Sequence, residues 1–118
     1  MQYRMFNSRG EIFSLGTKEI TLKPIPQEFA LHQNYPNPFN PVTNIRYDLK
    51  NTEHVTLTIF DLNGRKINQI VNKIQAAGHQ SADWNSTDSF GKPVSAGVYL
   101  YQMKAGQFFQ SKKMILLK

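Results

Sequence analysis

The three histidines are the residues that most readily suggest a chemical site. His32, His54 and His79 stand in separate segments, and the chain has no cysteine. Metal sites in proteins combine histidines with carboxylates or cysteines at short, characteristic spacings. The spacing here matches none of these, so we expect neither a metal site nor a bound cofactor.

Residues 83–88 (Asp-Trp-Asn-Ser-Thr-Asp) have the oxygen-rich composition of a calcium loop. The glycine and the distal glutamate that an EF-hand requires are missing, so we predict a turn stabilised by Asx hydrogen bonds. No serine has a matching histidine and aspartate, and no glycine-rich loop would bind phosphate. We therefore predict that the protein is not an enzyme.

The charge of +6, from 14 basic and 8 acidic residues, invites a nucleic-acid interpretation. Only Arg65-Lys66 and Lys112-Lys113 are adjacent basic pairs, and the other basic residues are scattered. This distribution argues against a polyanion site. No apolar run approaches the roughly 18 to 20 residues that a membrane helix needs, and no signal peptide opens the chain. We expect either a cytoplasmic protein or a fragment whose export signal lay on a missing part.

The segment that must organise the fold is rich in proline. In Tyr35-Pro36-Asn37-Pro38-Phe39-Asn40-Pro41 each proline fixes its own φ, lacks an N–H donor and favours an extended residue before it. We call this segment the proline motif, and it can be neither helix nor central strand. We predict that it opens a domain and plugs Tyr35 and Phe39 into an apolar surface.

After the proline motif the sequence alternates as half-buried strands do. Ile45, Tyr47 and Leu49 share one face, residues 55–59 repeat the pattern in a strand that pairs with the first or faces it, and Asn63-Gly64 is a strong hairpin signal. The periodicity is weak in residues 72–77, where a short helical turn is possible. The final apolar run, residues 114–117, predicts an end buried on both sides. Short strands separated by Gly, Asn and Pro turns predict an all-β, immunoglobulin-like antiparallel sandwich of about seven strands.

The first part of the chain has a different pattern. Residues 1–22 predict a β-hairpin, and prolines stiffen the linker that follows, so we divide the chain into 1–26 and 27–118. An isolated hairpin is marginal in water. We expect it to pack on the main domain, on a second copy of the chain in a dimer, or on an upstream domain.

Several motifs resemble the type A C-terminal sorting domain of the type IX secretion system of Bacteroidetes. In chain order these motifs are the proline motif, Thr43-Asn44-Ile45-Arg46-Tyr47, Ile59-Phe60-Asp61-Leu62-Asn63-Gly64-Arg65-Lys66, Gly91-Lys92-Pro93-Val94-Ser95-Ala96-Gly97-Val98-Tyr99 and Lys112-Lys113-Met114-Ile115-Leu116-Leu117-Lys118. The resemblance runs from about Phe29 to Lys118 and implies an immunoglobulin-like sandwich.

The resemblance also implies a function. The domain is expected to be a secretion address read by the outer-membrane translocon and its shuttle proteins, and its cargo is expected to cross the periplasm to the cell surface or the medium. By this resemblance, the residues that the translocon recognises are Gly97, Val98, Tyr99, Lys112, Lys113, Met114, Ile115, Leu116, Leu117 and Lys118. A sortase-like protease is expected to cut within Lys23, Pro24, Ile25, Pro26, Gln27 and Glu28. Residues 1–26 then resemble the end of an upstream cargo domain and its linker.

Two alternatives remain open, both without catalysis. The chain could be a carbohydrate-binding sandwich that stacks sugars on Trp84, Tyr99 and Tyr101, although core packing is the better expectation for these aromatics. It could also be a scaffold related to the flagellar hook-cap domain. For a sorting signal we hypothesise that a partner adds a β-strand to the edge of the last strand, and that deletion of residues 114–118 abolishes export.

Overall fold

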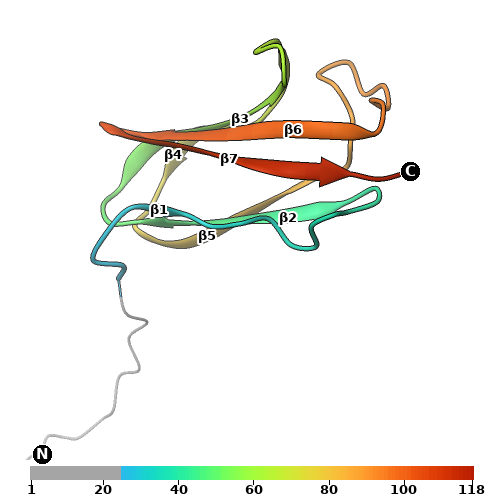
Figure 1. Ribbon diagram of the computed structural model, residues 1–118. Helices are drawn as coiled ribbons and strands as arrows, with labels where there is room; N and C mark the ends of the chain where they lie inside the picture. The colour runs from blue at the N-terminus through green and yellow to red at the C-terminus, as the bar shows by residue number, and fades with distance from the viewer. Residues whose placement is uncertain (1–24) are drawn as a thin grey trace, which may run out of the picture.

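The computed structural model describes residues 25–118, which form two antiparallel β-sheets packed face to face (Figure 1). The three-stranded sheet has the order β1-β2-β5 and consists of β1 (Ala30–Leu31), β2 (Thr43–Leu49) and β5 (Gly78–Trp84). The four-stranded sheet has the order β4-β3-β6-β7 and consists of β3 (Glu53–Asp61), β4 (Lys66–Gln75), β6 (Gly97–Ala105) and β7 (Phe108–Leu116). The prediction of a seven-stranded antiparallel sandwich is confirmed. The hairpin predicted for residues 1–22 lies outside the described residues.

The core lies between the sheets and follows the alternation of the strands. In β2, Ile45, Tyr47 and Leu49 are buried, and residues between them face outward. In the opposite sheet Val55, Leu57, Ile59, Tyr99, Tyr101, Met103, Met114 and Leu116 complete the core. β2, β3, β6 and β7 therefore each have one face in the core, as a two-layer sandwich requires, whereas β4 at the sheet edge buries only Val71 fully. Within residues 25–118 no helix is long and apolar enough to cross a membrane.

The hairpin between β3 and β4 forms at the predicted Asn-Gly turn. Gly64 has a φ of 82°, a left-handed conformation that suits glycine. The carboxylate of Asp61 accepts hydrogen bonds from the backbone N–H groups of Asn63 and Arg65, each at 2.9 Å. The preceding strands β2 and β3, whose arrangement the sequence left open, lie in different sheets.

The structure corrects two local expectations. Residues 72–75 continue β4 instead of forming a helical turn, because they pair with residues 53–56 of β3. The final apolar run is buried on one side only: Met114 and Leu116 face the core, but Ile115 is 37% exposed and Leu117 is 51% exposed. The reason is that β7 belongs to a two-layer sandwich, so its outer face has no third layer to cover it.

The loop after β5 has the expected Asx turn. Asp88 Oδ1 accepts hydrogen bonds from the N–H groups of Phe90 and Lys92, both at 2.9 Å. Trp84 Nε1 donates to the carbonyl of Thr87 at 2.8 Å, so the indole is buried with its polar atom satisfied. These contacts account for the oxygen-rich composition of residues 83–88 through turn formation.

Candidate functional site

The proline motif lies against the end of β7, although the two are far apart in the sequence (Figure 1). The N–H of Phe39 donates to the carbonyl of Ile115 at 3.0 Å, and the N–H of Leu117 donates to the carbonyl of Phe39 at 2.9 Å. Asn37 Oδ1 accepts from the N–H of Ile115 at 3.0 Å. The motif therefore occupies the free edge of the last strand.

Phe39 is the aromatic residue of the motif that enters the core. Its ring is buried and lies 5.9 Å from the Trp84 ring, and Trp84 meets Tyr99 edge-on at 5.3 Å. Tyr35, in contrast, is 75% exposed, so the prediction that it plugs into an apolar surface is wrong. The backbone of Tyr35 pairs with Asn44, and the neighbouring Asn34 takes the inward position instead.

Buried polar groups hold the start of the motif in place. Asn34 Nδ2 donates to Thr43 Oγ1 at 2.9 Å and to the carbonyl of Pro36 at 3.1 Å. The hydroxyl of Tyr101 accepts from the N–H of Asn34 at 2.8 Å and donates to the carbonyl of His32 at 2.7 Å. Burial raises the pKa of Tyr101 to about 12. The hydroxyl thus stays protonated and links β6 to the residues that immediately precede the proline motif.

The Gly97-Val98-Tyr99 segment joins the same region from the other side of β7. Gly97, Val98 and Tyr99 pair in register with Leu116, Ile115 and Met114. One stretch of β7 is therefore flanked by the proline motif and by the beginning of β6. We call this region the sandwich corner: Tyr35–Pro41, Gly97–Tyr99 and residues 112–118.

Only part of the predicted recognition set can reach a partner from the folded state. Tyr99, Met114 and Leu116 are buried, whereas Val98 and Gly97 are half-buried. Lys113, Ile115, Leu117 and Lys118 are exposed, and Lys112 is half-buried. Of the predicted set, the residues that offer a surface are therefore those that alternate with the core residues. Tyr99, Met114 and Leu116 belong to the hydrophobic core and stabilise the fold.

The hypothesis that a partner adds a β-strand to β7 requires free backbone groups at its edge, but several of these are already hydrogen-bonded within the chain. Asn37 and Phe39 use the backbone groups of residues 115 and 117, and Gln33 Nε2 donates to the carbonyl of Lys113 at 2.9 Å. A partner strand along residues 113–117 would have to displace the chain's own residues. Side-chain contact with the outer face needs no such displacement.

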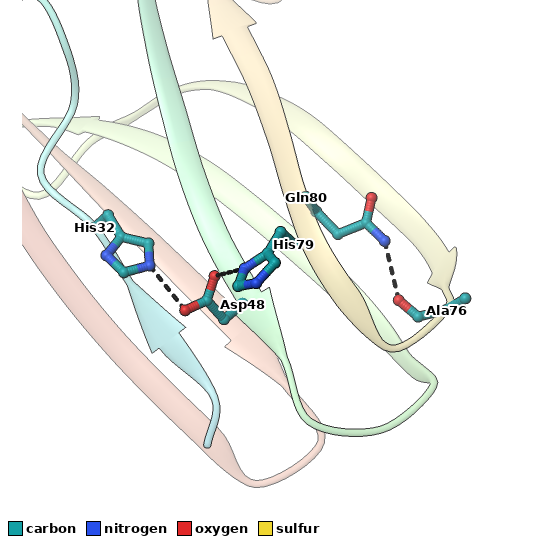
Figure 2. A network of polar contacts seen from close by, with 5 residues as sticks. All are labelled: His32, Asp48, Ala76, His79 and Gln80. Atoms are coloured by element: carbon teal, nitrogen blue, oxygen red, sulfur yellow. Dashed lines mark hydrogen bonds and ion pairs between the residues drawn. The ribbon is translucent and has the colours of Figure 1, made fainter. Parts of the chain in front are cut away.

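The sequence did not reveal a second cluster, which lies on the three-stranded sheet (Figure 2). His32 Nε2 lies 2.9 Å from Asp48 Oδ2, and His79 Nδ1 lies 2.8 Å from Asp48 Oδ1. The strand order β1-β2-β5 brings these separate segments together, with Asp48 and His79 as direct cross-strand partners. With Arg46, Gln80 and Ser81 they line an open hollow of about 430 Å³.

The cluster is a hydrogen-bonded carboxylate rather than a metal site. Burial opposes ionisation of Asp48, but hydrogen bonds from His79 and His32 and their charge outweigh it and hold its pKa below the usual value. Both carboxylate oxygens are thereby engaged. Among residues 25–118 no three histidines or carboxylates converge in a way that could hold a metal ion.

The predicted cleavage region is only partly described. Lys23 and Pro24 lie outside the described residues, while Ile25 is 61% exposed and Gln27 and Glu28 are also exposed. Burial begins after them: the ring of Phe29 stacks on that of Phe108 at 5.7 Å, and Leu31 is in the core.

The sequence and the fold both match known proteins. The model of the secretion system C-terminal sorting domain matches residues 33–117. No curated protein matches the chain. Similar solved structures include latent PorU from Porphyromonas gingivalis, a dimer (22% identity, TM-score 0.60), PorZ of the same organism, a surface component of its type IX secretion system (19%, 0.53), and the flagellar hook-capping protein FlgD from Xanthomonas campestris (21%, 0.52).

The matched regions differ in their share of each protein. The alignments cover 75% of this chain for PorU and PorZ, and 77% for FlgD. The chain spans 9% of the PorU chain, 11% of the PorZ chain and 63% of the FlgD chain. At these identities the likenesses show the immunoglobulin-like fold alone, which a secretion component and a hook cap share.

Proposed function

This chain belongs to the family of secretion system C-terminal sorting domains, and we propose that residues 27–118 are the address of a cargo protein exported by the type IX system. The family match over residues 33–117 carries this proposal. Membership indicates a sorting signal, a class of region that is typically non-catalytic, and export to the cell surface or the extracellular space. The likeness to FlgD concerns the fold and gives no separate support to a hook-cap role.

The partners in this proposal are the outer-membrane translocon and its shuttle proteins, met during passage through the periplasm. The exposed part of the predicted set supports contact at the sandwich corner: Lys113, Ile115, Leu117 and Lys118, beside the half-buried Gly97, Val98 and Lys112. Tyr99, Met114 and Leu116 then act through the fold, because they hold this surface in place.

A sortase-like protease then removes the domain within residues 23–28. The exposure of Ile25, Gln27 and Glu28 supports this, because a protease needs an extended and accessible chain. Residues 1–26 are proposed to be the end of the cargo and its linker. A dimer through the hairpin of residues 1–22 remains a prediction.

The test is export of a reporter. Residues 1–118 are fused behind a fluorescent protein that carries a signal peptide, in a type IX-competent host and in a matched strain without the translocon. We expect fluorescence in the medium or on the cell surface of the competent strain only, with the domain clipped off within residues 23–28. A folded, intact fusion that stays in the periplasm of both strains would contradict the proposal.

A further inference from the structure

The two outer faces of the sandwich differ in chemistry. Outward positions of β2 and β5 are polar: Asn44 bonds Asp83 at 2.7 Å, and Asp48 binds the two histidines. These polar groups satisfy one another. The outer face of the four-stranded sheet has an apolar centre instead, and the charged residues at its outward positions are lysines.

A row of four residues crosses this second face. Lys66 of β4 pairs with Phe60 of β3, Phe60 pairs with Leu100 of β6, and Leu100 pairs with Lys113 of β7. Phe60 and Leu100 are half-buried, and the two lysines at the ends of the row are exposed. Val98 and Ile115 are also paired and continue the apolar area beside this row.

Next to the row lies a hollow that could hold a side chain projecting from a partner protein. Its volume is about 250 Å³, and its lining residues are Phe60, Gly64, Leu100, Gln102 and Ser111. Phe60 and Leu100 are half-buried on the two central strands, and the exposed Lys66 and Lys113 stand on the two edge strands. A protein surface with a projecting apolar side chain fits this shape better than a flat lipid headgroup layer does.

The positive charge of this face favours a partner with an acidic surface. Its outward positions also include Lys104, and within residues 25–118 none of the outward positions of these four strands holds a carboxylate. Glu53 and Asp61 stand at the two ends of β3, on positions that alternate with the outward ones. Glu53 still lines a hollow with His54 and Lys104, at the opposite end of β3 from the row. A second copy of this face would bring lysines against lysines, which like-charge repulsion opposes.

Several residues of this face belong to the sorting-domain motifs, and their presence in these motifs is not explained by packing in the core. Ile59, Tyr99 and Met114 are buried and are accounted for by packing. Phe60, Val98 and Ile115 neighbour them in the sequence and point to the other side of the sheet. Phe60 pairs with Leu100 and Val98 with Ile115, so these residues form one contiguous apolar patch, and such a patch on an outer face is typical of an interaction site.

We propose that the outer face around Lys66, Phe60, Leu100, Lys113 and Ile115 docks an acidic protein surface that inserts an apolar side chain between the lysines. This inference rests on the proposed function and specifies it: the partner is a component of the secretion machinery with carboxylates around an apolar projection. Charge complementarity of this kind mainly sets the rate and specificity of association.

The test uses the reporter fusion with residues 1–118 and reverses the two lysine charges, Lys66→Glu together with Lys113→Glu. We expect export to fall at least about tenfold. Lys66→Arg with Lys113→Arg keeps the charges and should export normally. Lys50→Glu with Lys73→Glu makes the same net change at exposed sites outside this face and should also export normally. Thermal unfolding of each purified chain reports folding, and if the Glu pair lowers Tm, Lys66→Gln with Lys113→Gln replaces it.

The outcomes separate the two proposals. Normal export of the Glu pair overturns the docking face and leaves the sorting function intact. Failure of the unaltered fusion overturns the sorting function and the docking face with it. Binding of the unaltered chain to vesicles with 30% phosphatidylglycerol, lost in the Glu pair, would assign the face to anionic lipid and overturn the protein partner. An export defect of the Glu pair without vesicle binding supports the docking face.

Discussion

Phe39 and Leu116 are parallel backbone neighbours, joined by two hydrogen bonds of 3.0 and 2.9 Å between Phe39 and the residues on either side of Leu116. Both side chains are buried in the same core. The contact ties the proline motif to β7, the last strand of the sandwich. Stability and the exposed surface of the sandwich corner are therefore coupled.

Phe39→Ala should destabilise the domain by about 3 to 5 kcal/mol, because it removes a buried ring that packs against Trp84. Tyr35→Ala is the matched control: it removes an exposed aromatic from the same motif and should change the free energy of unfolding by less than about 0.5 kcal/mol. Urea unfolding followed by tryptophan fluorescence measures both. Equal losses in the two variants would show that the motif acts through its backbone alone.

Tyr101→Phe should cost about 1 to 3 kcal/mol at neutral pH, because the buried N–H of Asn34 and the carbonyl of His32 lose their partner. Tyr47→Phe is a control on the opposite sheet, since the hydroxyl of Tyr47 donates to one glutamine side chain, Gln75. A smaller loss is expected there. A loss at Tyr101 no larger than at Tyr47 would contradict the role given to this hydroxyl.

The raised pKa of Tyr101 also predicts a loss of stability in alkali. The unfolded tyrosine releases its proton near pH 10 and the folded one near pH 12. The unfolded state therefore binds fewer protons in this window, and stability falls as the pH rises from 10 to 12. In Tyr101→Phe the decline over this window should be shallower, as measured by urea unfolding at pH 9, 10 and 11. Parallel declines would exclude Tyr101 as a source.

Asp48→Asn should lower stability at pH 7 and have a smaller effect at pH 3. The folded carboxyl has a lowered pKa, so its contribution is present above its unfolded value of 3.8 and is lost as the pH falls through the folded value. Asp83→Asn is a control on the same face. Urea unfolding at pH 3, 5 and 7 makes the comparison. An Asp48 effect that does not change with pH would show that the histidine contacts add nothing.

Residues 27–118 should fold without residues 1–26, because the packed contacts begin at Phe29. We expect the Tm of the shortened chain to lie within about 3 °C of that of the full chain. Limited proteolysis of residues 1–118 should cut before Phe29 and leave a resistant fragment. A shortened chain that does not fold would move the domain boundary into residues 1–26.

Deletion of residues 114–118 should abolish export by unfolding the domain, since Met114 and Leu116 are core residues and Phe39 loses its partners. Ile115→Asn with Leu117→Asn changes only the exposed side of the same stretch. It should retain the Tm within about 3 °C and reduce export. Normal export of this pair would show that the exposed side of the last strand is not read.

Much of the fold follows from local pattern. Ile45, Tyr47 and Leu49 alternate, and Asn63-Gly64 accepts the left-handed backbone of a hairpin, so these elements could be predicted. The burial of Phe39 rather than Tyr35 could not, because it depends on pairing with the distant Leu116.

The same limit applies to the two surfaces described above. The contact of His32 and His79 with Asp48 arises only when β1 and β5 flank β2. Likewise, the row from Lys66 to Lys113 exists only in the order β4-β3-β6-β7. A sequence shows which side of a strand a residue occupies, but tertiary pairing decides its neighbours.

The closure of Phe39 on Leu116 has a consequence for biosynthesis. The last strand completes one edge of the four-stranded sheet and receives the proline motif, so folding must wait until residues 113–117 have been synthesised. A polypeptide released early from the ribosome lacks these residues and cannot assemble the corner. The proline motif is therefore without its β7 partner until residues 113–117 have been made, and these two segments close the sandwich together.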